Sequence, residues 1–174
     1  MKLHSILLTS AVIAILWTCN QPEQGNTNLA PAEFADPKYM QVGKKALDGL
    51  ADGDIDNFLK DYADNAVFLW NSGDSVAGKP AIYDYWKDRR TNVIDKIAYE
   101  NDIWLALKVN KPQKGPDRVG VWLLGWFHAT ITYKSGKSVT QWIHTDYHFD
   151  NADKIDRAIM YLDRAPINAA ITGK

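Results

Sequence analysis

The sequence contains a single cysteine, Cys19, among its 174 residues. An intramolecular disulfide is therefore excluded, and the rest of the chain has no thiol for catalysis. Basic residues are not in excess either, because 20 lysines and arginines stand against 21 aspartates and glutamates. Without a basic stripe, nucleic acid is not an expected partner.

The N-terminus has an apolar run that is too short to cross a bilayer. It extends from Ile6 to Trp17, with Lys2 before it and Cys19 shortly after it. This order is typical of a secretory signal. The placement of Cys19 resembles a bacterial lipobox, although Trp17 and Thr18 differ from the small residues usual there. The resemblance implies lipidation of Cys19, attachment to a lipid bilayer and an exported, periplasmic or outer-surface location; ordinary signal peptidase cleavage near Cys19 is the alternative.

The sequence predicts one domain with short appendages. Residues 1–18 are interpreted as the signal peptide. Residues 19–34 contain the lipidated cysteine and a polar, proline-containing stretch that cannot bury enough apolar surface to order itself, as expected of a flexible tether. The domain is assigned to residues 35–165, and residues 166–174 are assigned to a C-terminal tail.

Helices are predicted first and strands afterwards. Asp36–Pro37 is a helix-start signal, Asp54 begins a second helix with one apolar stripe, and Pro80 opens a third. From about residue 94 onward, β-rich runs separated by turns predict an antiparallel meander. This order predicts an α+β domain in which helices cover one face of a curved sheet.

Aromatic residues are abundant. Six of the seven tryptophans and all eight tyrosines lie beyond residue 18. This exceeds what the core of such a domain requires, and it indicates a cavity or an interface.

The turn at Ser135–Gly136 fixes which side chains share a face of the sheet. Interpreted as a two-residue hairpin loop, it pairs His128 with Ile143 on one face and puts Phe127 beside His144 on the other. Both faces are then partly apolar, so one is expected under the helices and the other against a second subunit.

The run "WIHTDYHFD" places His144, Asp146 and His148 at every second position. On a strand the two histidines are about 13 Å apart between Cα atoms, which is too far to share one ion. No metal site is expected.

Two segments, residues 49–86 and 135–163, resemble the nuclear transport factor 2-like superfamily, within it the SnoaL-like and ketosteroid isomerase-like branch. The motifs are "GDIDNFLKDYADNAVF", "AGKPAI" and "FDNADKI". The resemblance implies a cystatin-like cone, with three N-terminal helices packed on a curved, mainly antiparallel sheet around a pocket. Trp70, Ala46 and Thr145 stand where the isomerase branch has its catalytic base and oxyanion-hole groups, so ketosteroid isomerisation is not expected.

The resemblance and the hairpin count together predict a pocket that binds a small aromatic or ring-shaped molecule without turnover and without a cofactor. The predicted ligand-binding residues are Trp70, Trp86, Trp122, Trp126, Thr130, Gln141, Thr145 and Tyr147. One alternative is a lyase or isomerase, a dehydratase or cyclase, using His128 as acid or base with Tyr62 as its partner. Another is an interaction domain of the cell envelope, in which Phe127, Trp142 and His144 on the outer face contact a second protein, and a homodimer through that face is also expected.

Overall fold

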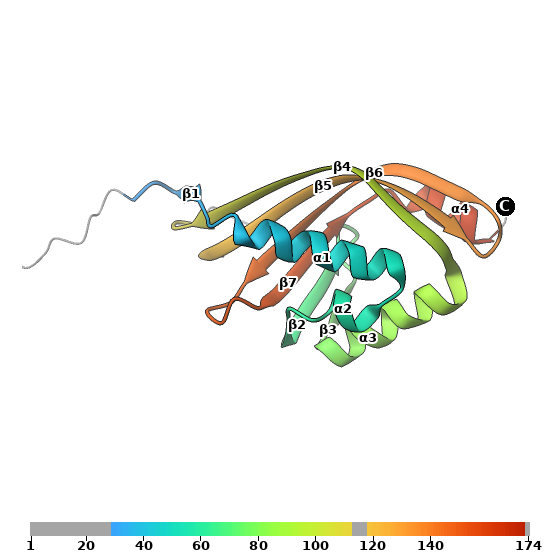
Figure 1. The fold of residues 1–174 in the computed structure, drawn as a ribbon, viewed down its shortest axis with the longest axis horizontal. Helices are drawn as coiled ribbons and strands as arrows, with labels where there is room; N and C mark the ends of the chain where they lie inside the picture. The colour runs from blue at the N-terminus through green and yellow to red at the C-terminus, as the bar shows by residue number, and fades with distance from the viewer. Residues whose placement is uncertain (1–28, 113–117, 173–174) are drawn as a thin grey trace, which may run out of the picture.

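The computed structural model describes residues 29–112 and 118–172. Helices and one seven-stranded sheet form the predicted α+β fold (Figure 1). The helical elements are α1 (Lys38–Asp52), α2 (Ile55–Phe58), α3 (Lys79–Asp88), the π-helical turn η1 (Arg89–Val93) and α4 (Arg164–Thr172). The strands are β1 (Ala32–Phe34), β2 (Tyr62–Trp70), β3 (Ser75–Ala77), β4 (Ile94–Val109), β5 (Gly120–Tyr133), β6 (Ser138–Phe149) and β7 (Ile155–Tyr161).

The boundaries of the first two helices follow from local capping. The Asp36 carboxylate accepts a hydrogen bond from the backbone N–H of Lys38 at 2.8 Å, at the start of α1. Gly53 ends α1 with φ 77°, a conformation that glycine adopts without a Cβ clash. Asp54 then caps α2 by accepting from the Asn57 N–H at 3.0 Å. The predicted starts of both helices are thus close to the observed ones.

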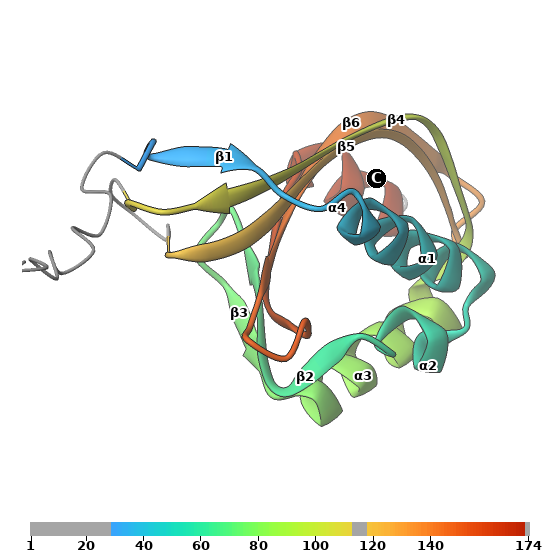
Figure 2. The same ribbon diagram turned by 60° about the vertical axis from the view of Figure 1, so that its left-hand side comes forward.

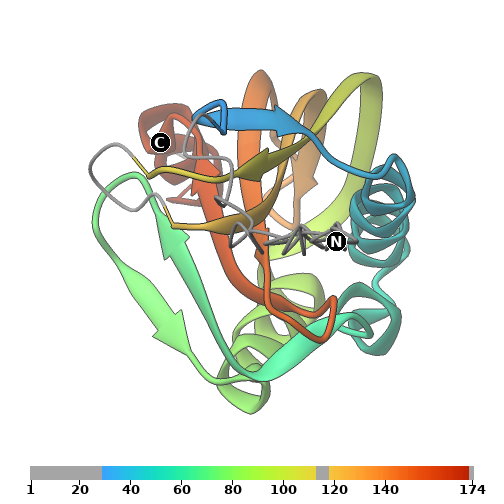
Figure 3. The ribbon, with the colours of Figure 1, turned by 90° about the vertical axis from the view of Figure 1, so that its left-hand side faces the viewer.

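The strand order in the sheet is β1-β4-β5-β6-β7-β2-β3. All neighbours are antiparallel except β2 and β7, which run parallel. The long strands β4, β5 and β6 arch over α1, while α2 and α3 lie opposite the arch (Figure 2). Seen from another side, β1 lies beside β4 at one edge and the β2–β3 hairpin forms the other edge (Figure 3).

The β5–β6 hairpin differs from the predicted register by one residue. Tyr133 and Lys137 close the loop, since the Tyr133 N–H donates to the Lys137 carbonyl at 2.8 Å. Three residues therefore form the loop, with Gly136 at φ 83° in the left-handed position that such loops require. The prediction of a two-residue loop was wrong. His128 consequently pairs with Trp142, and Trp126 pairs with His144.

A one-residue slip turns all side chains of one strand to the opposite face. On β6 the predicted inward residues do face the core, as the buried Ile143 and Tyr147 show. On β5 the assignment is reversed: Phe127 is fully buried against the helices, whereas His128 lies half-buried on the outer face. The predicted outer-face position of Phe127 and inner position of His128 were both wrong.

Both ends of the domain extend beyond the predicted core. β1 pairs with β4 within the segment predicted as a tether, with Ala32 opposite Val109. Most of residues 166–174, which the sequence assigns to a tail, belongs to α4. Ile167 and Ala170 of α4 are buried.

Candidate ligand-binding cavity

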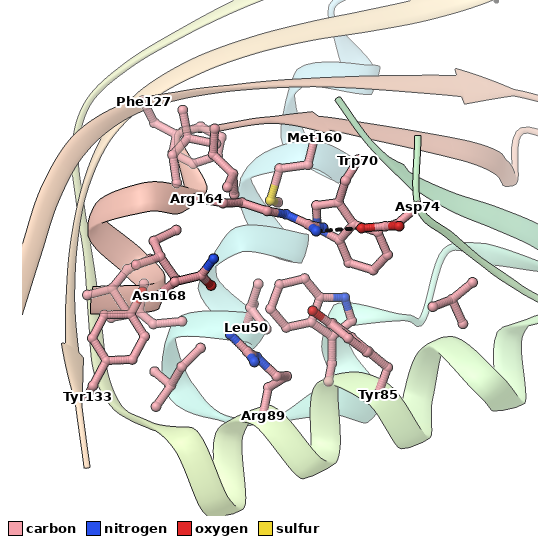
Figure 4. A pocket seen from close by; sticks show the side chains of 18 of the residues that line it. Leu50, Trp70, Asp74, Tyr85, Arg89, Phe127, Tyr133, Met160, Arg164 and Asn168 are labelled. Carbon is pink, nitrogen blue, oxygen red and sulfur yellow. Dashed lines mark hydrogen bonds and ion pairs between the residues drawn. The ribbon is translucent and has the colours of Figure 1, made fainter. Parts of the chain in front are cut away.

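A cavity of about 330 Å³ lies on the concave side of the sheet (Figure 4). This volume is at the lower end of the range of roughly 300–1,000 Å³ for small-molecule sites. Its walls come from α1, α3, η1, α4 and strands of the curved sheet. The lining residues are Leu50, Trp70, Asp74, Ser75, Val76, Tyr85, Trp86, Arg89, Ile94, Ile97, Tyr99, Phe127, Ile131, Tyr133, Ile143, Met160, Leu162, Arg164, Ile167 and Asn168.

One wall of the cavity consists of packed aromatic rings. The Tyr85 ring lies 5.0 Å from that of Trp70 and 5.3 Å from that of Trp86, measured between centroids. Phe68 packs behind both indoles, at 4.9 Å and 5.6 Å. Because the rings hold one another in tilted and edge-on contacts, this wall is preorganised for a flat apolar group.

Three charged side chains line the cavity, and two of them neutralise each other. Arg164, at the start of α4, forms an ion pair with Asp74 and lies over the Trp70 ring, with its Cζ 5.4 Å from the centroid (Figure 4). The hydrogen bond from Arg164 lowers the pKa of Asp74, so this carboxylate stays ionised. The third charge is Arg89, which points into the cavity (Figure 4).

Arg89 and Arg90 are neighbours with different environments. Arg90 donates to three backbone carbonyls, those of Ala51, Ile94 and Asp95, and so ties the end of α1 to the start of β4. Arg89 has no ion pair with any described residue, and its Nε is buried without a hydrogen-bond partner. Its guanidinium Cζ lies 5.9 Å from the centroid of the Tyr85 ring. These two residues begin η1, and π-helical turns are frequent at functional sites.

Beneath the cavity lies a buried tyrosine pair. Tyr62 and Tyr147 pack edge-on with 6.3 Å between ring centroids, and Thr145 is fully buried near them. Burial raises the pKa of Tyr147 to about 12 and raises that of Tyr62 well above its ordinary value. Both phenols are therefore neutral at physiological pH, and neither lines the cavity.

The predicted ligand-binding residues fall into four groups. Trp70 and Trp86 line the cavity. Gln141 is engaged by the chain itself, since its side chain donates to the Asp163 carbonyl at 3.2 Å and accepts from the Asp163 N–H at 3.1 Å. Thr145 and Tyr147 are in the core below. The remaining predicted ligand-binding residues are on β5 and lie on the outer face: Trp122, Trp126 and Thr130. His128, the predicted acid or base, lies on that face too, so the predicted inward placement of these four residues was wrong.

The outer face has its own cluster of aromatic and titratable side chains. The His144 ring stacks on Trp126 at 4.5 Å between centroids, and its Nε2 lies 2.8 Å from an Asp146 carboxylate oxygen. Burial alone would lower the pKa of His144, but Asp146 and the Gly125 carbonyl outweigh it and raise the pKa. His148 lies 2.6 Å from an Asp156 carboxylate oxygen. Each of these histidines thus has a carboxylate partner.

The described residues contain neither a metal-binding cluster nor a helix that could span a membrane. Among residues 29–112 and 118–172, no three or more His, Cys, Asp or Glu side chains are grouped so as to hold a metal ion. Within the same ranges, no helix has both the length and the apolar composition needed to cross a bilayer. Cys19 and the predicted signal peptide lie outside the described residues.

Arg89 is the functional candidate that the sequence analysis missed. It follows Ile82 and Trp86 at helical spacing, on the side of α3 that faces the core. That spacing is the signal that could have identified it. The surrounding run "WKDRR" is strongly charged, which is more typical of a solvent-exposed helix end.

Solved structures show what the fold is similar to, whereas no protein-family model and no curated protein matches the sequence. An NTF2-like protein of unknown function from Burkholderia pseudomallei is 15% identical with a TM-score of 0.58, covering 76% of this chain and 96% of that one. A Shewanella denitrificans protein assigned as a SnoaL-like polyketide cyclase is 14% identical with a TM-score of 0.57, covering 80% of this chain and 100% of that one. The chain has the nuclear transport factor 2-like fold.

A third similar structure is a protein with a ketosteroid isomerase-like fold from Catenulispora acidiphila, solved in complex with trimethylamine. It is 9% identical with a TM-score of 0.56, covering 76% of this chain and 92% of that one. Identities this low establish the shared fold alone, which is a fold that serves many unrelated functions. The expected α+β architecture, with N-terminal helices packed on a curved and mostly antiparallel sheet, is thus confirmed.

Proposed function

We propose that this protein binds a small ring-shaped molecule in the cavity of its NTF2-like domain. The observation that carries the proposal is the aromatic wall of Trp70, Tyr85 and Trp86, in a cavity whose other walls combine aliphatic and polar side chains. Tilted, mutually supported rings favour a planar or alicyclic apolar body over a flexible polar one.

Two neighbouring residues of β4 provide a matched test. Ile97 is buried and lines the cavity, whereas Ala98 faces outward opposite Thr130. Ile97→Trp should fill the cavity and abolish binding of 2-naphthoate in isothermal titration calorimetry. Ala98→Trp adds the same bulk on the other face and should leave the affinity unchanged. Equal affinity in both variants, each shown by circular dichroism to be folded, would place the binding site elsewhere.

Binding without turnover is favoured over the acid–base hypothesis. All three histidines in the described part of the chain lie on the outer face, and His128 contacts Trp142 there. Tyr62, its predicted partner, is buried in the core between Phe58 and Tyr147. The predicted His128–Tyr62 pair is therefore not brought together, and the described residues of the cavity lining include no histidine to move a proton.

Membrane attachment through Cys19 remains part of the proposal, supported by the order of basic, apolar and small residues before it. Cys19→Ser should release the full-length protein from the membrane fraction of the expressing cells. Continued attachment of that variant would contradict lipidation.

The outer face supports a further proposal, that two copies associate through it. Trp142 and Ile103 are about half-exposed there, at 53% and 55%, which is a large apolar surface to leave in water. Trp142→Glu should shift a dimer to monomer in analytical ultracentrifugation. A wild type that is monomeric at all concentrations would contradict the homodimer and favour a different envelope partner.

A further inference from the structure

We propose that the ligand is a monoanion, a ring compound with one carboxylate, and that Arg89 binds this carboxylate. The inference rests on the proposed function, because it assumes that the cavity is the binding site. It specifies which class of ring compound the cavity selects.

The charged side chains of the cavity lining are not fully paired with one another. The lining contains two arginines and one aspartate, and Arg164 is paired with Asp74. Among the described residues that line the cavity, Arg89 is thus the one charged side chain without an ion-pair partner. A cation near apolar walls is costly unless a partner of opposite charge accompanies it. One ionised group on the ligand would supply that partner.

Unpaired donors point in the same direction. The Nε of Arg89 and the indole Nε1 of Trp86 are both buried without a hydrogen-bond partner in the described part of the protein. Both residues line the cavity, from positions three residues apart on α3 and η1. Buried donors normally have acceptors, so the missing partner is an acceptor group. A carboxylate has oxygens enough for both, and the arginine fork matches its geometry.

The surroundings of Arg89 limit the ligand to a small charge. The positive charge of Arg89 counteracts the effect of burial on the pKa of Tyr133, which nevertheless remains above its ordinary value. Tyr133 is therefore a neutral hydroxyl bearer beside the positive charge of Arg89. A dianionic phosphate would bring a second charge, for which the described residues of the cavity lining offer no further free cation, because Arg164 is held by Asp74.

The test compares acids with their isosteric amides on the full mature protein. The probes are benzoate, cyclohexanecarboxylate and 2-naphthoate, each paired with its carboxamide, and affinity is measured by isothermal titration calorimetry at millimolar ligand. The wild type should bind the acids more tightly, by on the order of tenfold or more, as expected for a charge-assisted contact. Arg89→Gln should remove this preference, and Arg89→Lys should restore part of it because it keeps the charge without the fork.

The control is Lys87→Gln, which removes one positive charge from the exposed side of α3 and should leave the preference intact. Three results would count against the proposal. Equal affinity of acids and amides for the wild type, or an unchanged preference in Arg89→Gln, would overturn the role of Arg89 while leaving the binding function standing. If neither acids nor amides bind, the proposed function itself fails, and the monoanion proposal fails with it.

Discussion

The two faces of the β5–β6 hairpin carry similar residue types but different chemistry. On the outer face, His144 and His148 each lie beside a carboxylate, and Trp126 stacks on His144. On the inner face, aromatic and aliphatic side chains surround Arg89, which has no ion-pair partner among residues 29–112 and 118–172. Aromatic content alone therefore does not identify a binding site. A charged side chain without an ion-pair partner distinguishes the candidate cavity from the outer face better than aromatic rings do.

The largest expected effect separates adjacent residues on β5. Phe127 is fully buried on the inner face, and Phe127→Ala should lower the free energy of unfolding by about 3–5 kcal/mol through lost burial and a new cavity. His128→Ala on the outer face should cost about 1 kcal/mol or less. Urea unfolding of the two variants measures both values. The register predicted from the sequence requires the opposite order, so a costlier His128→Ala would break the face assignment.

A close approach on the inner face gives the next largest effect. A Cβ at Gly125 would lie 2.3 Å from the Trp104 ring, and one at Gly43 of α1 would lie 2.7 Å from the same ring. Gly125→Ala should therefore destabilise the fold by about 1–3 kcal/mol through overpacking. Thermal unfolding of Gly125→Ala with and without Trp104→Leu checks the cause. Two strictly additive losses would show that the Trp104 contact is not responsible.

A smaller effect, dependent on pH, is expected from the outer face. Asp146 holds the pKa of His144 above its ordinary value, so protonation of His144 favours the folded state. This contribution is complete below the unfolded pKa and is lost as the pH rises through the higher folded pKa. The stability difference between wild type and His144→Gln should therefore shrink between about pH 6 and about pH 8.

Asp146→Asn provides the control for this pH effect, because it removes the charge that faces His144 and should flatten the pH dependence. Tyr161 of β7 also packs on the His144 ring, at 5.3 Å, and remains neutral in this range because burial and Asp146 raise its pKa. If the stability difference between wild type and His144→Gln grew with pH, protonation of His144 would not favour the folded state, and the prediction would be contradicted.

Much of the fold could be predicted from the sequence because its signals are local. The starts of α1 and α2 follow from the carboxylates of Asp36 and Asp54, and the meander follows from turn residues between β-rich runs. The register of β5 against β6 could not be predicted in this way. Large apolar side chains occur on both faces of β5, Phe127 on one and Trp126 on the other. The hydrophobic pattern therefore does not decide which face of β5 packs on the helices.

Of the candidate cavity, only lining residues on helix α3 and strand β2 could be predicted from the sequence. Trp86 follows from the inner stripe of α3, and Trp70 from its position at the end of β2. The predicted residues of β5 were assigned to the wrong face because the hairpin loop has one additional residue before Gly136. That residue moves each β5 side chain to the opposite face of the sheet. The pairing of Arg164 with Asp74 joins residues 90 positions apart, which local spacing does not reveal.

The most direct test of ligand binding on the inner face uses another pair of neighbours. Leu162 lines the cavity and Tyr161 faces outward beside His144, and both are half-buried. In a Cys19→Ser background, Leu162→Cys and Tyr161→Cys each provide one thiol, whose reaction rate with a methanethiosulfonate reagent is measured with and without 2-naphthoate. We predict that the ligand slows modification at 162 and leaves the rate at 161 unchanged. Protection at 161 alone, with binding confirmed by calorimetry, would contradict the account.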